Sequence, residues 1–283
     1  MVRLQAGPLV CEVDPSLGGC VMGLWHGDTP VLRSTHSPPT TARQSGCYPL
    51  VPYSNRIAHA RLQWQGTLYP LVRNNGDEAH AIHGVGWQRS WELLDSDERF
   101  ALLSYEHRPD SSWPFAFDSS QSYRLSPDSL ELSLSVTNQS ARVAPVGLGW
   151  HPFFMKRAQA HLSFVATGRW EMDEDKLPTR RLPCSGIEAD CSVLDLDHCY
   201  DGWSGTAMLA DSVLRIRVSS NLSRIVIFTN PARDVIAIEP VSHVNNALAL
   251  AAQGMAADEL GLATLEPGES VTASMTIAVE RVE

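Results

Sequence analysis

Three segments of the chain alternate apolar and polar residues with a period of two. Their apolar members are Leu130, Leu132, Leu134 and Val136, then Leu214, Ile216 and Val218, then Val271, Ala273, Met275, Ile277 and Val279. This alternation puts every second side chain on one face, as in a strand that buries one side and exposes the other. Such segments predict a fold built from antiparallel sheets.

Turn-forming residues separate the strand-like segments. They occupy 126–129, 65–67 between segments 61–64 and 68–72, and 95–99 between segments 91–94 and 100–105. Helical periodicity is scarce, and its best candidate, 247–262, is weakened by Gly254. We therefore predict an all-β fold, a large antiparallel β-sandwich, with residues 1–283 forming a single domain.

Composition limits the classes of partner. The chain has 283 residues and a net charge of −10, which disfavours nucleic acid and anionic membranes as partners. No stretch has the roughly 20 apolar residues of a membrane-spanning helix, and the first residues lack the apolar core of a signal peptide. Six cysteines without CxxC spacing favour reduced thiols. These features predict a cytoplasmic protein.

Common cofactor and nucleophile motifs are missing. There is no P-loop, and Gly147-Leu-Gly149 lacks the third glycine of a dinucleotide fingerprint. The run from Gly202 to Gly205 is one residue short of a hydrolase nucleophile elbow. His80-x-x-His83 has a spacing that suits a metal site on a helix, but the residues before it look like a loop. We expect no cofactor and no metal.

Glu239 is the most unusual ionisable residue, because it ends the apolar run 235–238. Carboxylates are rarely buried without a partner, so Glu239 is either paired structurally or held as a base with a shifted pKa. His83, His151, Arg56 and Asp197 also lie in stretches rich in apolar or aromatic residues. Taken alone, each of these residues could have a purely structural role, as a hydrogen-bonded core histidine, an ion-pair partner or a turn cap.

A series of short motifs places these residues in a recognisable order between about residue 47 and residue 270. The motifs are Asn55-Arg56-Ile57, Trp64-Gln-Gly66, Ile82-His83-Gly84, Trp150-His151-Pro152, Asp197-His198-Cys199, Ile238-Glu239-Pro240 and Leu265-Glu-Pro-Gly-Glu269. In this order the chain resembles the aldose 1-epimerase (galactose mutarotase) family. The resemblance implies the β-sandwich of that family, the galactose mutarotase-like supersandwich.

The resemblance also implies roles for individual residues. Glu239 falls at the position of the general base, and His151 at that of the general acid. Arg56, His83 and Asp197 fall at positions that hold sugar hydroxyls, although Asp195 or Asp201 could replace Asp197. No metal, nucleotide or covalent intermediate is required.

The implied function is an aldose 1-epimerase acting on a free aldohexose such as galactose or glucose. One alternative is a hexose-6-phosphate mutarotase, whose phosphate would need Arg89 or Arg180-Arg181 at the site. Others are a non-catalytic carbohydrate-binding protein on the same fold, and a glycosidase using Glu239 with Asp197. The expected partner is a small sugar, with no nucleic acid and no membrane, and the chain is expected to be a monomer or homodimer.

Overall fold

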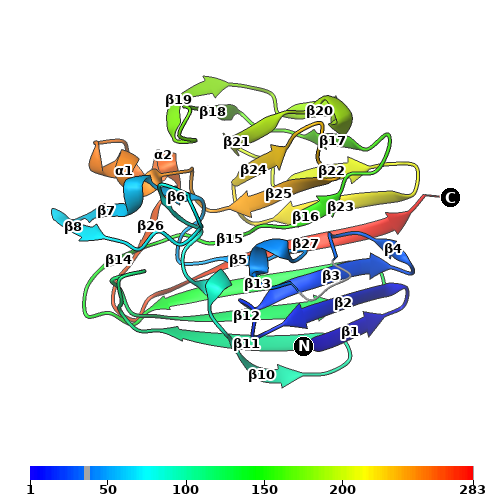
Figure 1. Ribbon diagram of the computed structural model, residues 1–283, viewed down its shortest axis with the longest axis horizontal. Coiled ribbons are helices and arrows are strands. Elements are labelled where there is room, and N and C mark those ends of the chain that lie inside the picture. Colours follow the sequence, from blue (N-terminus) through cyan, green and yellow to red (C-terminus); the bar gives the residue numbers. More distant parts are fainter. Residues whose placement is uncertain (35–38, 283) are drawn as a thin grey trace.

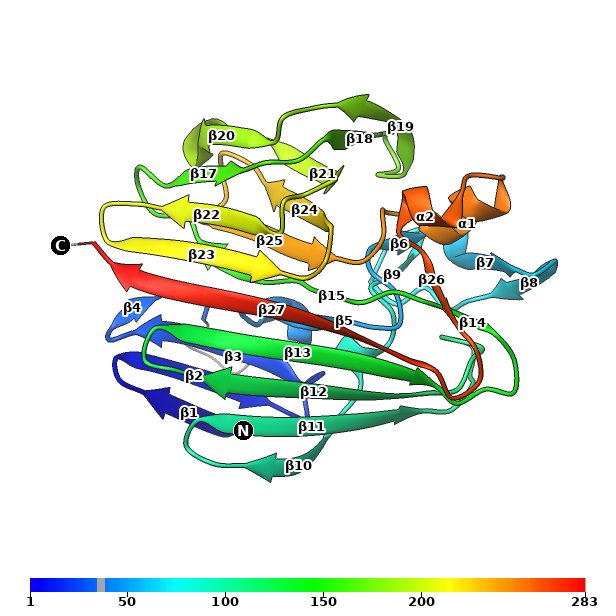
Figure 2. The same ribbon diagram turned by 180° about the vertical axis from the view of Figure 1, so that it is seen from behind.

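Strands dominate the computed structural model, which describes residues 1–34 and 39–282 (Figure 1). A nine-stranded sheet forms one layer, seen from outside in Figure 2. A four-stranded sheet and an eight-stranded sheet lie side by side in the other layer. The strands of these sheets pair antiparallel, which confirms the predicted large β-sandwich.

The nine-stranded sheet contains the three alternating segments as adjacent strands. In spatial order it consists of β10 (Glu92–Ser96), β11 (Phe100–His107), β12 (Phe117–Leu125), β13 (Ser129–Asn138), β27 (Ser270–Arg281), β23 (Leu214–Ser220), β22 (Thr206–Ala210), β17 (His161–Phe164) and β20 (Ile187–Asp190). Leu130, Ile277 and Val218 lie opposite one another across β13, β27 and β23, and all three are fully buried. Their rows of apolar side chains form the inner face of the sandwich.

The second layer contains the N-terminal strands and a strand whose seven residues, 235–241, are all buried. Its four-stranded sheet is β1 (Val2–Ala6), β2 (Leu9–Asp14), β3 (Cys20–His26) and β4 (Thr29–Pro30). Its eight-stranded sheet is β19 (Pro178–Pro183), β18 (Gly168–Met172), β21 (Leu196–Asp201), β24 (Arg224–Thr229), β25 (Val235–Val241), β15 (Gly149–Trp150) and β5 (Pro49–Leu50), with β16 (Phe153–Met155) also paired to β25. A bridge between Leu32 and Phe154 links the two sheets.

Short elements gather at one end of the sandwich (Figure 1). They are the strand pairs β6 (Arg56–Ile57) with β9 (Ala81–Ile82), β7 (Arg61–Trp64) with β8 (Thr67–Pro70), and β14 (Ala144–Val146) with β26 (Ala263–Leu265), and the helices α1 (Ala247–Ala252) and α2 (Ala257–Leu260). Single 3₁₀ turns occur at η1 (Ala42–Gln44), η2 (Ala58–Ala60), η3 (Gly86–Gln88) and η4 (Cys191–Val193). The expected helix over 247–262 is two helices, because the chain turns at Gly254, whose φ is +100°.

The cysteines behave as apolar packing residues. All six are free thiols, and five of them are buried. Within the described part of the chain, no helix has the length and apolar character needed to cross a membrane.

Candidate active site

Glu239 lies on β25, in the middle of the eight-stranded sheet. β24 flanks this strand on one side and β15 and β16 on the other, and all seven residues of β25 are buried. Glu239 is 2% exposed, and its Oε1 lies 3.2 Å from Nε2 of His151. Its Oε2 is buried and bonds to no described residue. A buried carboxylate oxygen without a partner is costly, so its unmet hydrogen-bonding capacity marks this atom as a candidate contact for a polar ligand.

Strand register brings His151 to Glu239. The pairs Gly149–Val241 and Phe153–Ala237 flank residue 151 in one common register, which places it directly across from residue 239. Side chains opposite one another on adjacent antiparallel strands share a face and lie within contact distance. The sequence therefore produces the pair through cross-strand neighbours rather than through a flexible loop.

Aromatic rings fix the orientation of the His151 imidazole. Its ring centroid lies 4.8 Å from that of Tyr48 and 4.3 Å from that of Phe153, with interplanar angles of 28° and 31°. The His151 backbone N–H donates to the Tyr48 carbonyl at 3.0 Å. Nδ1 of His151 is buried and has no partner among the described residues. One ring nitrogen thus faces Glu239, and the other is available to a ligand.

His83 comes next to His151 through a strained turn. Its φ is +62°, an unusual value for a residue with a side chain, and its ring meets that of His151 edge-on at 5.3 Å. The Asn55 backbone N–H donates to Nδ1 of His83 at 3.1 Å, which puts the ring proton on Nε2. Gly84 follows with φ +70°, and a Cβ there would lie 2.1 Å from the Val51 carbonyl oxygen. The turn therefore requires glycine at 84.

Arg56 neighbours His83 through the β6–β9 pair, in which Arg56 lies opposite Ile82. Its guanidinium forms an ion pair with Glu78 at 3.4 Å, and the side chains of the two residues are 12% and 20% exposed. Glu78, on the loop after β8, was not anticipated from the sequence. Because that loop shows no periodic pattern, nothing in the sequence marks Glu78 as the partner of Arg56.

Of the three acids considered around residue 197, Asp197 is the one whose charge acts on Glu239. Asp197 lies opposite Phe228, and Glu239 lies opposite Val226, so the two acids share one face of the sheet. Asp195 is exposed. Asp201 accepts from Trp170 Nε1 at 2.8 Å and is paired with Arg181 at 2.7 Å. The bonds of Asp201 are therefore structural.

Burial shifts the protonation of the pair. Loss of water raises the pKa of Glu239 well above its ordinary value, and repulsion from Asp197 raises it further while Arg56 opposes the change. Loss of water also lowers the pKa of His151 well below its ordinary value, and Arg33 and Arg43 add to this. Both groups are thus pushed toward their neutral forms.

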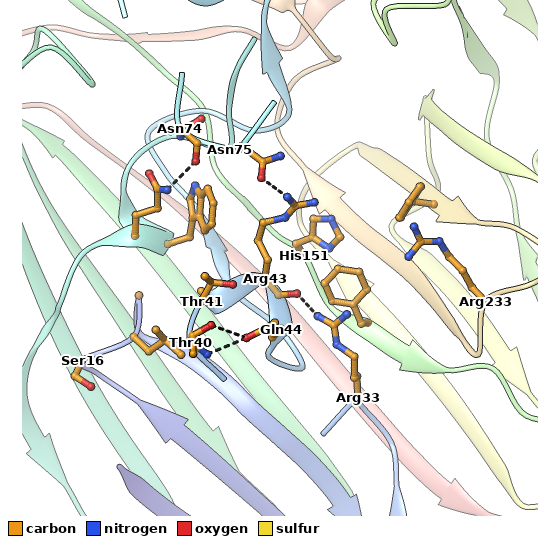
Figure 3. A pocket seen from close by; sticks show the side chains of 18 residues that line it. Ser16, Arg33, Thr40, Thr41, Arg43, Gln44, Asn74, Asn75, His151 and Arg233 are labelled. Atoms are coloured by element: carbon orange, nitrogen blue, oxygen red, sulfur yellow. Dashed lines mark hydrogen bonds between the residues drawn. The ribbon is translucent and has the colours of Figure 1, made fainter. Parts of the chain in front are cut away.

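A cavity of about 630 Å³ opens onto His151 and Phe153 (Figure 3). This volume is in the range of small-molecule sites. Glu239, His83, Arg56 and Asp197 are not among the residues that line the cavity, so Glu239 lies one contact deeper, behind His151. Trp87 is 4% exposed and also borders this cavity.

The cavity is also lined by three arginines that were not predicted from the sequence: Arg33, Arg43 and Arg233. They are scattered along the chain and form no local cluster. The arginines that were considered for a phosphate lie elsewhere. Arg89 pairs with Asp110 at 3.0 Å, and Arg180 and Arg181 line a separate cavity beside Trp170.

His80 does not join a ligand cluster with His83. Its Nδ1 accepts from the His59 backbone N–H at 2.9 Å, and its Nε2 lies 3.1 Å from the Asp175 carbonyl oxygen. Both ring nitrogens are therefore engaged with the backbone.

Residues 2–278 match the sequence profile of the family described as aldose 1-epimerase. The chain belongs to the aldose 1-epimerase family. The ordered motifs from Asn55 to Glu269 lie within the matched range.

Known relatives support the fold along the whole chain. The uncharacterized Escherichia coli K12 protein YphB is 30% identical over 294 residues, covering 98% of each chain. A crystal structure from Escherichia coli K12 has a TM-score of 0.88 at 30% identity and covers 99% of this chain and 98% of that one. A galactose mutarotase-like protein from Clostridium acetobutylicum has a TM-score of 0.86 at 18% identity, covering 99% and 94%, and shows the shared fold alone.

Proposed function

We propose that the protein is an aldose 1-epimerase that interconverts the α and β anomers of an aldohexose such as galactose or glucose. The observation that carries the proposal is the buried contact of 3.2 Å between Glu239 and His151, in which each partner keeps one unbonded polar atom. A structural ion pair has no need of such atoms. An acid–base pair needs them, because each partner must also reach the substrate.

In the proposed reaction Glu239 removes the proton from the hydroxyl on C1 while His151 protonates the ring oxygen. The C1–O5 bond breaks with its electron pair moving to O5, and a C1 aldehyde forms. Rotation about C1–C2 and reclosure from the other face give the second anomer. During closure the roles exchange, since His151 takes the proton from the O5 hydroxyl and Glu239 returns one to O1. Acting together, the two groups avoid both an alkoxide at O5 and an oxocarbenium-like cation at C1.

The residues around the pair supply groups that can hold sugar hydroxyls. His83 presents an N–H at Nε2, Arg56 a guanidinium, and Asp197 a carboxylate acceptor. The fixed turn at Gly84 and the β6–β9 pair hold His83 and Arg56 in place without substrate. Such preorganisation reduces the entropy lost when a sugar binds.

Polarimetry on freshly dissolved α-glucose and α-galactose tests the proposal. Wild type should accelerate relaxation to the anomeric equilibrium, and Glu239→Gln should lose on the order of 10²–10⁴-fold of that acceleration, the usual contribution of a positioned acid or base. Glu188→Gln is the matched control, since the side chain of Glu188 is 78% exposed on an edge strand.

Two results would count against this function. One is a folded wild-type protein that accelerates neither sugar. The other is Glu239→Gln keeping the wild-type rate. Sugar binding by calorimetry in Glu239→Gln separates loss of chemistry from loss of the site, and binding without acceleration in wild type would favour a carbohydrate-binding protein.

A further inference from the structure

The cavity in front of His151 has an unusual charge. Its lining includes three arginines, Arg33, Arg43 and Arg233, and no aspartate or glutamate among the described residues. The whole chain carries a net charge of −10. An acidic protein has therefore gathered three arginines at the entrance to its candidate catalytic pair.

None of the three arginines forms an ion pair with a carboxylate in the described part of the chain. Elsewhere, the guanidinium groups of Arg56, Arg157 and Arg181 each have such a partner. Within residues 1–34 and 39–282, other arginines, such as Arg224, also lack a carboxylate partner, and Arg224 donates to backbone carbonyls instead. What distinguishes the cavity is that three arginines without an ion pair among the described residues line one space, with the charge and geometry that suit an anion.

Aromatic rings and backbone carbonyls hold the arginine side chains. The Arg33 guanidinium lies 3.8 Å from the Phe153 ring centroid and donates from Nε to the Ser45 carbonyl at 3.0 Å. Arg233 lies over Phe228 at 4.4 Å. Arg43 donates to the side chain of Asn75 across the cavity mouth (Figure 3). These contacts position the charges without neutralising them.

The arginines also act on His151. Phe153 contacts both the His151 ring and the Arg33 guanidinium, so Arg33 is one side chain away from the imidazole. After burial, the positive charges of Arg33 and Arg43, and then Arg233, disfavour the protonated imidazole and lower the pKa of His151. A ligand that brings negative charge to the arginines would offset this effect and favour the protonated acid.

We propose that the aldose substrate carries an anionic substituent, a carboxylate or a phosphate, which Arg33, Arg43 and Arg233 bind while C1 lies at the catalytic pair. This inference rests on the proposed function and adds the substrate class to it. A neutral hexose offers hydroxyl groups only, and none of them offsets three cations that have no ion pair among the described residues. A carboxylate or phosphate accepts several charge-assisted hydrogen bonds from guanidinium groups.

The experiment compares kcat/KM for anomerisation of glucose, glucuronate and glucose 6-phosphate above the uncatalysed rate. In wild type, at least one anionic sugar should exceed glucose by about tenfold or more. Arg43→Gln and Arg233→Gln should each reduce this ratio of anionic to neutral sugar about tenfold. Arg89→Gln should leave the ratio unchanged, because Arg89 is an exposed arginine paired with Asp110, away from the cavity. A preference for glucuronate or for glucose 6-phosphate identifies the anionic group.

If kcat/KM for glucose equals that for both anionic sugars, the inference is overturned and the proposed function stays intact. Equal losses on all three sugars in Arg43→Gln and Arg233→Gln would also overturn it. If no sugar is anomerised, calorimetric binding of glucuronate and glucose 6-phosphate decides the question. Binding by wild type that Arg43→Gln abolishes supports the anion site, and no binding by wild type refutes it.

Discussion

In the proposed reaction, Glu239 takes a proton from the C1 hydroxyl while His151 gives one to the ring oxygen. Before opening, the proposed pair is Glu239 carboxylate with His151 imidazolium; afterwards, it is a carboxylic acid with a neutral imidazole. Burial raises the pKa of Glu239 and lowers that of His151, so loss of water favours the second state. The environment of the pair therefore assists the proton transfers that open the ring. Closure restores the first state.

We expect the pH dependence of activity to follow the number of protons bound by Glu239 and His151 together. The pair works when it holds one proton, and loses activity when it takes up a second or gives up the first. Because burial lowers the pKa of His151 below its ordinary 6.5, activity should fall on the acid side only below pH 6.5. Because burial raises the pKa of Glu239 above its ordinary 4.5, the alkaline fall should lie above pH 4.5. A bell-shaped plot of kcat/KM against pH checks this, and an acid fall centred above pH 6.5 would refute it.

Asp197 and Asp201 should respond differently to the same change. Asp197→Asn removes a charge that raises the pKa of Glu239, so the alkaline fall in activity should move to lower pH. Asp201→Asn weakens bonds to Trp170 and Arg181 and should cost about 1–3 kcal/mol of stability with an unchanged pH profile. Thermal unfolding and pH–rate profiles of both variants provide the comparison. The opposite assignment, with the profile moved by Asp201→Asn alone, would place Asp201 at the site.

Some site residues could be found from the sequence because each breaks its local pattern. Glu239 interrupts an apolar run, and His151 lies among aromatic residues. Arg33, Arg43 and Arg233 could not be found this way. They lie far apart along the chain, and only the folded chain brings them around one cavity. Their neighbours in sequence give no sign of a shared ligand.

Strand register, rather than any single side chain, makes Glu239 and His151 neighbours. The strand β25 has β16 and β15 on one side and β24 on the other, which places His151 and Asp197 on either side of Glu239. A one-residue slip of β25 would turn Glu239 to the opposite face of the sheet. The sequence shows the strands through their alternation, but not this pairing, because the partners come from distant parts of the chain.

The turn residues in the sequence predicted the hairpins, whereas the helix expected over 247–262 was predicted only in part. The predicted turns at 65–67 and 95–99 connect β7 to β8 and β10 to β11, although residue 67 already belongs to β8 and residues 95 and 96 still belong to β10. The segment 247–262 is apolar enough for one helix, yet its backbone turns at Gly254. Propensity alone could not decide whether the glycine would be tolerated inside a helix or end it.

The turn that holds His83 should be intolerant of a side chain at Gly84. Gly84→Ala adds a Cβ 2.1 Å from the Val51 carbonyl oxygen and imposes a positive φ on alanine. The positive φ alone costs about 1–3 kcal/mol, and the clash adds to it. Gly66→Ala is the matched control, with φ +77° and nothing within 4 Å of its Cβ. Thermal unfolding should show a larger loss for Gly84→Ala, and equal losses would contradict the steric explanation.

The two layers of the sandwich have different roles in the protein. The nine-stranded sheet supplies a continuous apolar face, and the eight-stranded sheet carries the candidate catalytic pair. The fold class was predictable, since alternation over many segments leaves few other architectures. The arrangement of sheets around one cavity was not, because it depends on contacts between segments that are distant in sequence.

The most direct test is a double-mutant cycle on kcat/KM for anomerisation, with Glu239→Gln, His151→Asn and the double variant. Each single change should cost on the order of 10²–10⁴-fold. Because the proposed mechanism moves both protons in one concerted step, the double variant should be about as slow as the slower single variant. Losses that multiply, as for independent residues, or a single variant with wild-type activity would contradict a paired acid and base.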